Sequence, residues 1–153
     1  GCLSPEAAHH ISIGSETLVL RQQCVSANAQ QLAEWFATRP EISRVYFPGL
    51  PSHPQHARVK SLFRHAGSLM SIELKPEYDL FRFLDALELV ILSTNLGDNR
   101  TLAIPVAHTI YAELGPVRRA EMGIGDGTVR LSIGIEDISD LIADFAQALA
   151  KAA

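Results

Sequence analysis

Cysteine and clustered positive charge are both scarce in this sequence. Cys2 and Cys24 are the only cysteines in 153 residues, so there is no disulfide framework. Acidic residues outnumber lysine and arginine by 17 to 13, and apart from Arg118 and Arg119 the basic residues stand singly. This distribution argues against nucleic acid or an anionic membrane as a partner. Because no apolar run could span a bilayer and no segment is typical of a signal peptide, we expect the cytoplasm as the compartment.

Histidine occurs six times, but its spacing does not favour a metal centre. His9 is adjacent to His10, and His53 precedes His56 by three residues. A zinc ion needs three or four converging ligands, and no cysteine or carboxylate joins either pair at a recognisable spacing. We therefore expect no metal site, and we interpret the segment HPQH as a loop that starts a helix.

The hydrophobic pattern predicts one domain built from both helices and strands. With 47% hydrophobic and 20% charged residues, the chain can bury roughly 68–70% of its unfolded surface. Apolar residues at helical spacing from Val25 to Phe36 indicate a long helix that begins well before Ser15 and ends before Pro40, with Gly14 as a candidate kink. The pattern predicts strands at 42–47, 70–74, 89–92 and 129–135, and helices at 56–64, 80–87, 118–122 and from 138 onward. The predicted fold class is α+β, a small and mainly antiparallel sheet with helices on one side.

The segment VRLSIGIED, from Val129 to Asp137, places a single arginine within a predicted strand. Aliphatic residues alternate with Arg130 and small or polar residues, so the aliphatic face belongs to the core and Arg130 faces the other way. Beside Ser132 and Gly134 its guanidinium has room for a bidentate grip on a carboxylate, worth roughly 1.5–3 kcal/mol. The alternative is an edge-strand arginine that pairs with a nearby glutamate or is solvated.

Other candidate features have simpler explanations. The turn GIGDG, 123–127, precedes a strand, whereas a phosphate-binding glycine loop follows a strand and opens a helix. Cys24 on a helix is more often a small buried apolar residue than a nucleophile, because no histidine or aspartate partner is at a known spacing. Trp35 and Phe36 are most simply core and domain-interface residues.

Four segments together resemble one enzyme family over nearly the whole chain. They are Arg21–His56, Gly67–Lys75, Ser93–Leu102 and the C-terminal stretch GTVRLSIGIEDISDLIADFAQAL. In this order they are similar to the Cys/Met-metabolism family of pyridoxal-phosphate enzymes. The NLGD at 95–98 resembles its O-acetyl- and O-succinylhomoserine sulfhydrylase members most.

The resemblance implies that residues 1–153 form the C-terminal domain of a fold-type I pyridoxal-phosphate enzyme. Family members hold the cofactor on a lysine in a Ser/Thr-flanked motif, and Lys60, Lys75 and Lys151 lack that context. Pyridoxal 5'-phosphate would therefore be bound by an N-terminal portion that this sequence does not contain. A helix at about 5–38, preceded by the loop Gly1–Pro5, would link the two domains.

The resemblance also assigns roles to two residues. Arg130 and Asn95 match the family positions that bind the α-carboxylate of the substrate, although Asn-x-Gly-Asp is also good turn chemistry. No catalytic, cofactor-binding or metal-binding residue is expected in this segment. The stretch IPVAHTIY, 104–111, departs from the usual family pattern near the expected leaving group of the substrate, which leaves the exact substrate open.

The implied activity is γ-replacement on an O-acylated homoserine, as in sulfhydrylases and cystathionine γ-synthase. The alternatives are a C–S lyase of the methionine γ-lyase or cystathionine lyase type, a non-catalytic ligand-binding or assembly module, and an aminotransferase-like relative. Expected partners are an amino-acid substrate, the pyridoxal-phosphate-binding domain of the same protein, and further copies in a homo-oligomer, usually a tetramer. The isolated chain is expected to be inactive.

Overall fold

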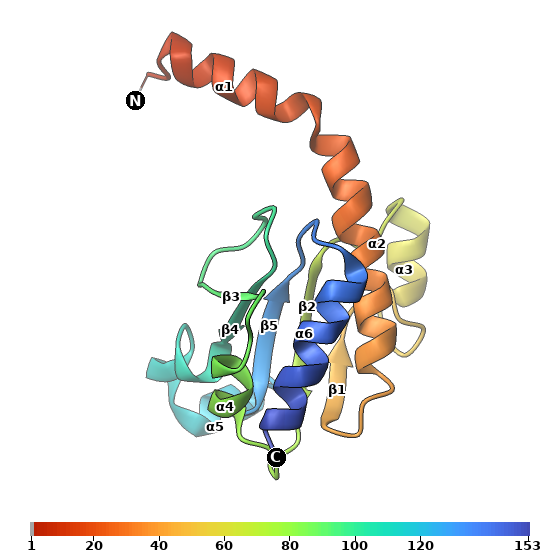
Figure 1. The fold of residues 1–153 in the computed structure, drawn as a ribbon, viewed down its shortest axis with the longest axis vertical. Helices are drawn as coiled ribbons and strands as arrows, with labels where there is room; N and C mark the ends of the chain where they lie inside the picture. The colour runs from red at the N-terminus through yellow and green to blue at the C-terminus, as the bar shows by residue number, and fades with distance from the viewer. Residues whose placement is uncertain (1) are drawn as a thin grey trace.

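The computed structural model describes residues 2–153, in which helices and strands are interspersed (Figure 1). The helices are α1 (Pro5–Glu16), α2 (Leu18–Phe36), α3 (His56–Leu62), α4 (Leu80–Asp85), α5 (Gly115–Glu121) and α6 (Ile138–Lys151). The strands are β1 (Ile42–Tyr46), β2 (Leu69–Leu74), β3 (Ile91–Leu92), β4 (Leu102–Pro105) and β5 (Thr128–Ser132). Two short 3₁₀ helices, Val106–His108 and Ala112–Leu114, lie between β4 and α5. Gly1, at the start of the predicted linking loop, lies outside the described residues.

The five strands form one sheet in the order β1-β2-β5-β4-β3. Three neighbouring pairs are antiparallel, and β3 runs parallel to β4. The sheet is therefore mixed, with antiparallel pairing predominant. At its two outer edges, β1 has a register shift between Ile42 and Arg44, and β3 contains only two residues.

Two strand predictions need correction. The strand predicted at 89–92 is confined to Ile91–Leu92, because the backbone N–H groups of Leu89 and Val90 bind a side chain instead of a neighbouring strand. The strand Leu102–Pro105 was missed. Its first three residues are all buried, so it lacks the apolar–polar alternation by which a half-buried strand is recognised.

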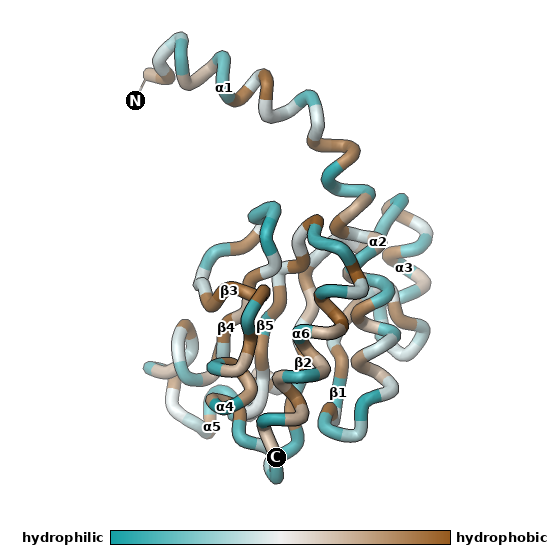
Figure 2. The backbone as a smooth tube through the Cα atoms, viewed as in Figure 1, coloured by the Kyte–Doolittle hydropathy of each residue, from teal (hydrophilic) through white to brown (hydrophobic). Residues whose placement is uncertain are grey.

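The hydrophobic core lies between one face of the sheet and helices α2, α4 and α6 (Figure 1). Ile72 and Leu131 cover the centre of the sheet and are fully buried. Phe145 of α6 packs edge-on against Phe36 of α2 at 5.0 Å between ring centroids, and stacks with Phe83 of α4 at 6.4 Å. Figure 2 shows α6 alternating between hydrophobic and hydrophilic residues, as expected for a helix with one buried face.

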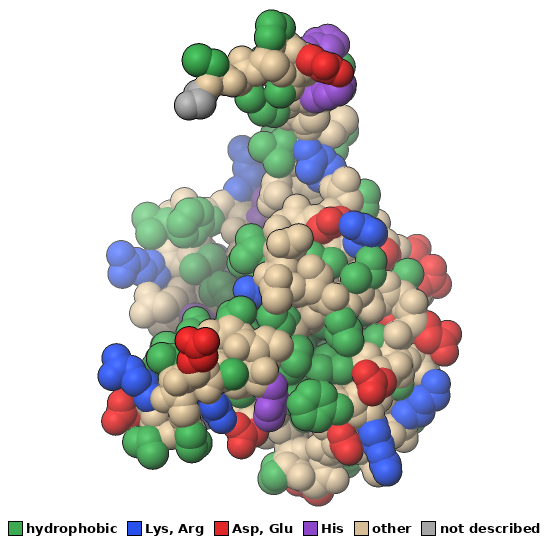
Figure 3. Space-filling view, turned by 90° about the vertical axis from the view of Figure 1, so that its left-hand side faces the viewer, with side chains coloured by type: hydrophobic (Ala, Val, Ile, Leu, Met, Phe, Trp, Pro, Cys, Tyr) green, Lys and Arg blue, Asp and Glu red, His purple; other side chains and the backbone are tan. Residues whose placement is uncertain are grey.

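The long N-terminal helix is interrupted at Thr17, three residues after the predicted kink at Gly14. The side chain of Arg21 donates hydrogen bonds across this break. Its Nη2 donates to the Gly14 carbonyl oxygen at 2.7 Å, and its Nε donates to Thr17 Oγ1 at 3.2 Å. None of the residues of α1 is buried, and Figure 3 shows this helix standing clear of the rest of the molecule. In α2 the buried residues run from Val25 to Phe36, so its first two turns, like α1, lie outside the core.

The segment that follows β5 departs from the apolar–polar alternation predicted for 129–135. β5 ends at Ser132, and although Ile133 is buried, Ile135 is 41% exposed and does not belong to the core face. Two residues singled out in the sequence are both half-buried. Cys24 has its Sγ 4.0 Å from the Ile135 carbonyl oxygen. Trp35 packs edge-on against Phe36, at 5.0 Å between ring centroids.

Within residues 2–153, no helix combines the length and the apolar character needed to cross a membrane.

Candidate functional site

Arg130 lies in the middle of β5, on the sheet face opposite α2 and α6. In register beside it are Ser71 of β2 and Ile104 of β4. Its Nη2 donates to the carbonyl oxygens of Thr94 at 2.8 Å and Asn95 at 3.0 Å. Among the residues that the structure describes, no carboxylate lies within ion-pair distance of its guanidinium. Of the two sequence-based alternatives, pairing with a glutamate is therefore not observed.

The two carbonyl contacts fix the orientation of the Arg130 guanidinium without neutralising its charge. Its Nε is buried and has no hydrogen-bond partner within residues 2–153. Nη1 donates no hydrogen bond to the described residues, so its two N–H groups remain available to an acceptor. The predicted bidentate grip would require Nη2 to release at least one carbonyl, because both of its hydrogens are already used.

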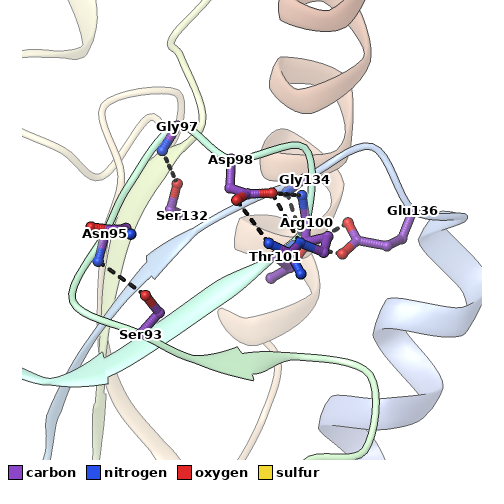
Figure 4. A network of polar contacts seen from close by, with 9 residues as sticks. All are labelled: Ser93, Asn95, Gly97, Asp98, Arg100, Thr101, Ser132, Gly134 and Glu136. Carbon is purple, nitrogen blue, oxygen red and sulfur yellow. Dashed lines mark hydrogen bonds and ion pairs between the residues drawn. The ribbon is translucent and has the colours of Figure 1, made fainter.

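Asn95 lies in the exposed loop 93–99, between β3 and β4, which passes over Arg130. Its backbone N–H donates to Ser93 Oγ at 3.2 Å, and its side chain makes no hydrogen bond to the described residues (Figure 4). The structure therefore brings Asn95 and Arg130 together, as predicted, but through the backbone carbonyl of Asn95. The free side-chain amide keeps its two N–H donors available.

The loop 93–99 is tied to β5 at a second point. The backbone N–H of Gly97 donates to Ser132 Oγ at 2.9 Å (Figure 4). Gly97 has φ +77°, a left-handed conformation that favours glycine. The turn and the ligand interpretations of NLGD are thus compatible, because the turn itself places Asn95 above the strand that carries Arg130.

Glu136 connects the end of this loop to the segment that follows β5. Its two carboxylate oxygens accept the backbone N–H of Thr101 at 2.5 Å and the Thr101 hydroxyl at 2.9 Å. The same hydroxyl accepts the backbone N–H of Gly134 at 2.9 Å (Figure 4). The sequence did not predict these contacts of Glu136.

Asp98 and Arg100 form an exposed ion pair at the end of the loop. Arg100 Nε and Nη2 each lie 3.1 Å from a carboxylate oxygen of Asp98, and its backbone N–H donates to the same group at 2.9 Å. The side-chain and backbone hydrogen bonds from Arg100 lower the pKa of Asp98 to about 2. Asp98 therefore stays ionised, and its charge and that of Arg100 largely cancel outside the site.

Asp144, on α6, anchors the turn that leads into β3 and the loop. Its carboxylate accepts the backbone N–H groups of Glu88, Leu89 and Val90 at 2.8, 2.9 and 3.0 Å. Burial works against ionisation of this carboxyl, but these bonds and one from the Gln147 amide outweigh it and hold the pKa of Asp144 below its usual range. Sequence reasoning missed this residue, because an aspartate on an amphipathic helix is normally exposed.

The three lysines of the chain lie in different parts of the fold. Lys60 lies on α3, Lys75 follows β2, and Lys151 ends α6, where it approaches Glu88 at 3.8 Å. A Cβ atom at Gly125 would meet the Glu73 carboxylate, so this carboxylate lies against the glycine turn 123–127. The guanidinium of Arg130 supplies donors of the kind that a carboxylate accepts.

The histidine pairs do not converge on a metal position. His56 Nδ1 lies 3.0 Å from the Pro48 carbonyl, and His53 Nδ1 accepts the backbone N–H of Gln55 at 3.1 Å. Within residues 2–153, no three histidine, cysteine or acidic residues come together as metal ligands. The histidines 53 and 56 instead hold the proline-rich loop before α3.

Helices cover one face of the mixed sheet, and on the other face the Arg130 guanidinium has no carboxylate partner among the described residues. Residues 1–150 match the family of Cys/Met metabolism PLP-dependent enzymes, and the chain belongs to that family. The resemblance noted in the sequence is thereby confirmed, and the family depends on pyridoxal phosphate.

Known relatives cover several activities within this family. The chain is 44% identical over 149 residues to an O-succinylhomoserine sulfhydrylase of Pseudomonas aeruginosa, covering 97% of this chain and 37% of the relative. It is 40% identical to an L-methionine gamma-lyase of Pseudomonas putida, covering 99% of this chain and 38% of the relative.

Solved structures of related enzymes also match the fold of this chain. An O-acetylhomoserine sulfhydrylase of Wolinella succinogenes matches with a TM-score of 0.85 at 39% identity, over 96% of this chain and 39% of that one. A cystathionine gamma-lyase of Lactobacillus plantarum, complexed with L-serine, matches with a TM-score of 0.91 at 29% identity, over 98% of this chain and 39% of that one. The chain thus spans less than two fifths of the length of these proteins.

Proposed function

We propose that residues 1–153 act as the C-terminal, substrate-orienting domain of a pyridoxal-phosphate-dependent enzyme of sulfur amino-acid metabolism. The favoured reaction is γ-replacement on O-acetyl- or O-succinylhomoserine, as in sulfhydrylases or cystathionine γ-synthase. The relative named O-succinylhomoserine sulfhydrylase, at 44% identity, supports this choice. The 40% identity to a protein named L-methionine gamma-lyase supports C–S bond elimination as the second candidate.

The observation that carries the proposal is the unpaired cation at Arg130. Thr94 and Asn95 hold its Nη2 by their carbonyl oxygens, while Nη1 and the Asn95 amide remain available as donors. A substrate α-carboxylate placed against these groups would be fixed at one end of the molecule. Holding that end sets the direction of the Cα–H bond, and positioning of this kind can supply several kcal/mol of a reaction barrier.

Pyridoxal phosphate, when bound, serves as the electron sink that makes loss of the Cα proton possible. The residues of this chain would bind and orient the amino acid, and the lysine and phosphate anchor would come from outside it. The remaining partners we propose are the pyridoxal-phosphate-binding domain of the same protein and further copies in a homo-oligomer. The cytoplasm is the proposed compartment.

Substitution of Arg130 in the full-length enzyme tests this role. A charge-assisted hydrogen bond is worth about 1.5–3 kcal/mol, so Arg130→Ala should raise KM for the homoserine ester by about 10- to 150-fold. Arg118→Ala is the matched control, because Arg118 is an exposed arginine on α5 outside the site. A KM within about twofold of the wild-type value for Arg130→Ala would refute the assignment.

The products separate the two candidate reactions. With sulfide present, γ-replacement yields an amino acid that contains the added sulfur, whereas elimination yields an oxo acid and ammonia whether or not sulfide is present. Incubation of the enzyme with each ester and with L-methionine, followed by mass spectrometry, distinguishes replacement from elimination. Formation of neither kind of product would contradict both candidates.

A further inference from the structure

We propose that Glu136 is a positioning residue for the carboxylate site, acting through Thr101 on the loop 93–99; this inference rests on the proposed function. Arg130 depends on that loop for its orientation, because Thr94 and Asn95 supply both acceptors of its Nη2. Any displacement of the loop therefore rotates or releases the guanidinium.

The loop itself has few attachments of its own. Residues 94–97 are exposed, and Gly97 reaches the body of the domain through one hydrogen bond to Ser132 Oγ. At its far end, the Asn99 carbonyl accepts the backbone N–H of Ile135 at 2.8 Å. What fixes the loop is thus the geometry of its two ends, one at β3 and the other at Thr101.

Thr101 is the fixed point at the second end. It is fully buried, and both its backbone N–H and its hydroxyl donate to the Glu136 carboxylate. The hydroxyl oxygen also accepts the backbone N–H of Gly134, so one side chain joins the loop to the chain that leaves β5. Each donor in this network points at an acceptor, which leaves Thr101 with a single arrangement (Figure 4).

The Thr101–Glu136 contact is closely packed on the side of Gly134 and α2. A Cβ atom at Gly134 would come within 2.6 Å of the Arg100 carbonyl carbon and would also meet the Asn99 carbonyl oxygen and the Glu136 carboxylate. The buried Asn28 of α2 donates its side-chain amide to the carbonyl oxygens of Gly134 at 3.1 Å and Glu136 at 2.8 Å. The backbone that carries the Glu136 carboxylate is therefore held by α2.

The contacts form one connected path from a helix in the core to the substrate site. Asn28 holds the backbone at Glu136, the Glu136 side chain holds Thr101, and Thr101 lies between the loop 93–99 and β4, directly before Leu102. Glu136 would not touch the substrate. Its removal should weaken binding of the carboxylate while leaving the chemical step nearly unchanged.

The first test compares Thr101→Val with Thr101→Ser in the full-length enzyme. Valine matches threonine in shape but removes the hydroxyl that Glu136 and Gly134 share, whereas serine retains it. We expect Thr101→Val to raise KM for the amino-acid substrate about tenfold, with kcat within about twofold, and Thr101→Ser to restore both. Equal KM values for the two variants would overturn the proposal.

A double-mutant cycle then asks whether Glu136 acts through Arg130. Glu136→Ala should raise KM by at least about fivefold in the wild-type background, but by less than about twofold when Arg130 is already alanine. The control is Asp140→Ala, which removes an exposed carboxylate from the first turn of α6. Additive effects on KM would mean that Glu136 stabilises the fold without positioning Arg130, and would overturn the proposal.

The two proposals fail in different ways. If Arg130→Ala itself leaves KM unchanged, the proposed function is wrong. If Arg130→Ala raises KM while Glu136→Ala does not, only the positioning role is wrong. Should Glu136→Ala not accumulate as folded protein, the Thr101→Val and Thr101→Ser pair decides, because both side chains fit the buried position.

Discussion

Asp144 should make one of the largest side-chain contributions to the stability of this domain. Asp144 is 7% exposed, and its carboxylate accepts three consecutive backbone N–H groups between α4 and β3. Asp144→Ala leaves these donors without their acceptor, and the N–H of Val90 is buried and cannot turn to solvent instead. Removing one partner from a buried charged network costs about 3–5 kcal/mol, so we expect a loss of at least about 3 kcal/mol.

That loss can be measured as a shift in the thermal midpoint. For a domain of this size, 1 kcal/mol corresponds to about 2–4 °C, so Asp144→Ala should lower Tm by about 6–12 °C. Asp144→Asn keeps one carbonyl oxygen and should cost about half as much, because a neutral acceptor forms a weaker bond. The fluorescence of Trp35, the one tryptophan in the chain, reports unfolding. Asp140→Asn, one turn earlier on α6 and exposed, is the matched control.

The pH dependence supplies an independent check. The folded pKa of Asp144 lies below its usual range, so its contribution is fully present above the unfolded pKa of about 3.9 and is lost as pH falls through the folded pKa. The stability difference between wild type and Asp144→Asn should therefore shrink as the solution is acidified below about pH 4. A fall in Tm of less than about 2 °C for Asp144→Ala, or a difference that stays constant into acid, would refute the reasoning.

Three further outcomes follow from local geometry. Gly97→Ala should destabilise the domain by about 1–2 kcal/mol, because its φ of +77° suits glycine; an unchanged midpoint of urea unfolding would contradict this. Gly127→Ala would place a Cβ atom 2.5 Å from the Leu74 carbonyl oxygen, so the free energy of unfolding should fall by about 1–3 kcal/mol. An unchanged free energy of unfolding would show that the backbone at Leu74 moves to accommodate the methyl group. The Asp98 carboxyl should titrate in an NMR experiment with a pKa of about 2, and Arg100→Ala should move it toward the ordinary value; a normal pKa in the intact chain would show that the ion pair does not persist in solution.

The parts of the fold that sequence predicts well are those with a clear period. The helix from Ile138 and the strand around Arg130 follow from apolar residues at helical and alternating spacing, and the structure has both. The strand Leu102–Pro105 has no such period, because its first three residues are all buried. The helix break fell at Thr17 because the side chain of Arg21 satisfies the exposed carbonyl of Gly14, a contact that composition alone does not reveal.

The candidate site was predictable only as far as its two recognised residues. The family resemblance brought Arg130 and Asn95 together, and the structure places them in contact. It did not indicate that Asn95 contributes its carbonyl, since loop geometry decides which atom faces the arginine. Glu136 and Asp144 were invisible for a shared reason: each binds backbone N–H groups of segments distant in sequence, and such pairings have no periodic signature.

The two edges of the sheet bear on how this domain behaves at high concentration. An outer strand with unpaired N–H and carbonyl groups is a template for strand addition from another molecule, which leads to aggregation. Here β3 offers only two residues, too few for a stable ladder, and the irregular register of β1 at Ile42 and Arg44 bends the other edge and places a charge on it. A flat β-bonded association through either edge is therefore disfavoured, whatever surfaces the domain uses for specific contacts.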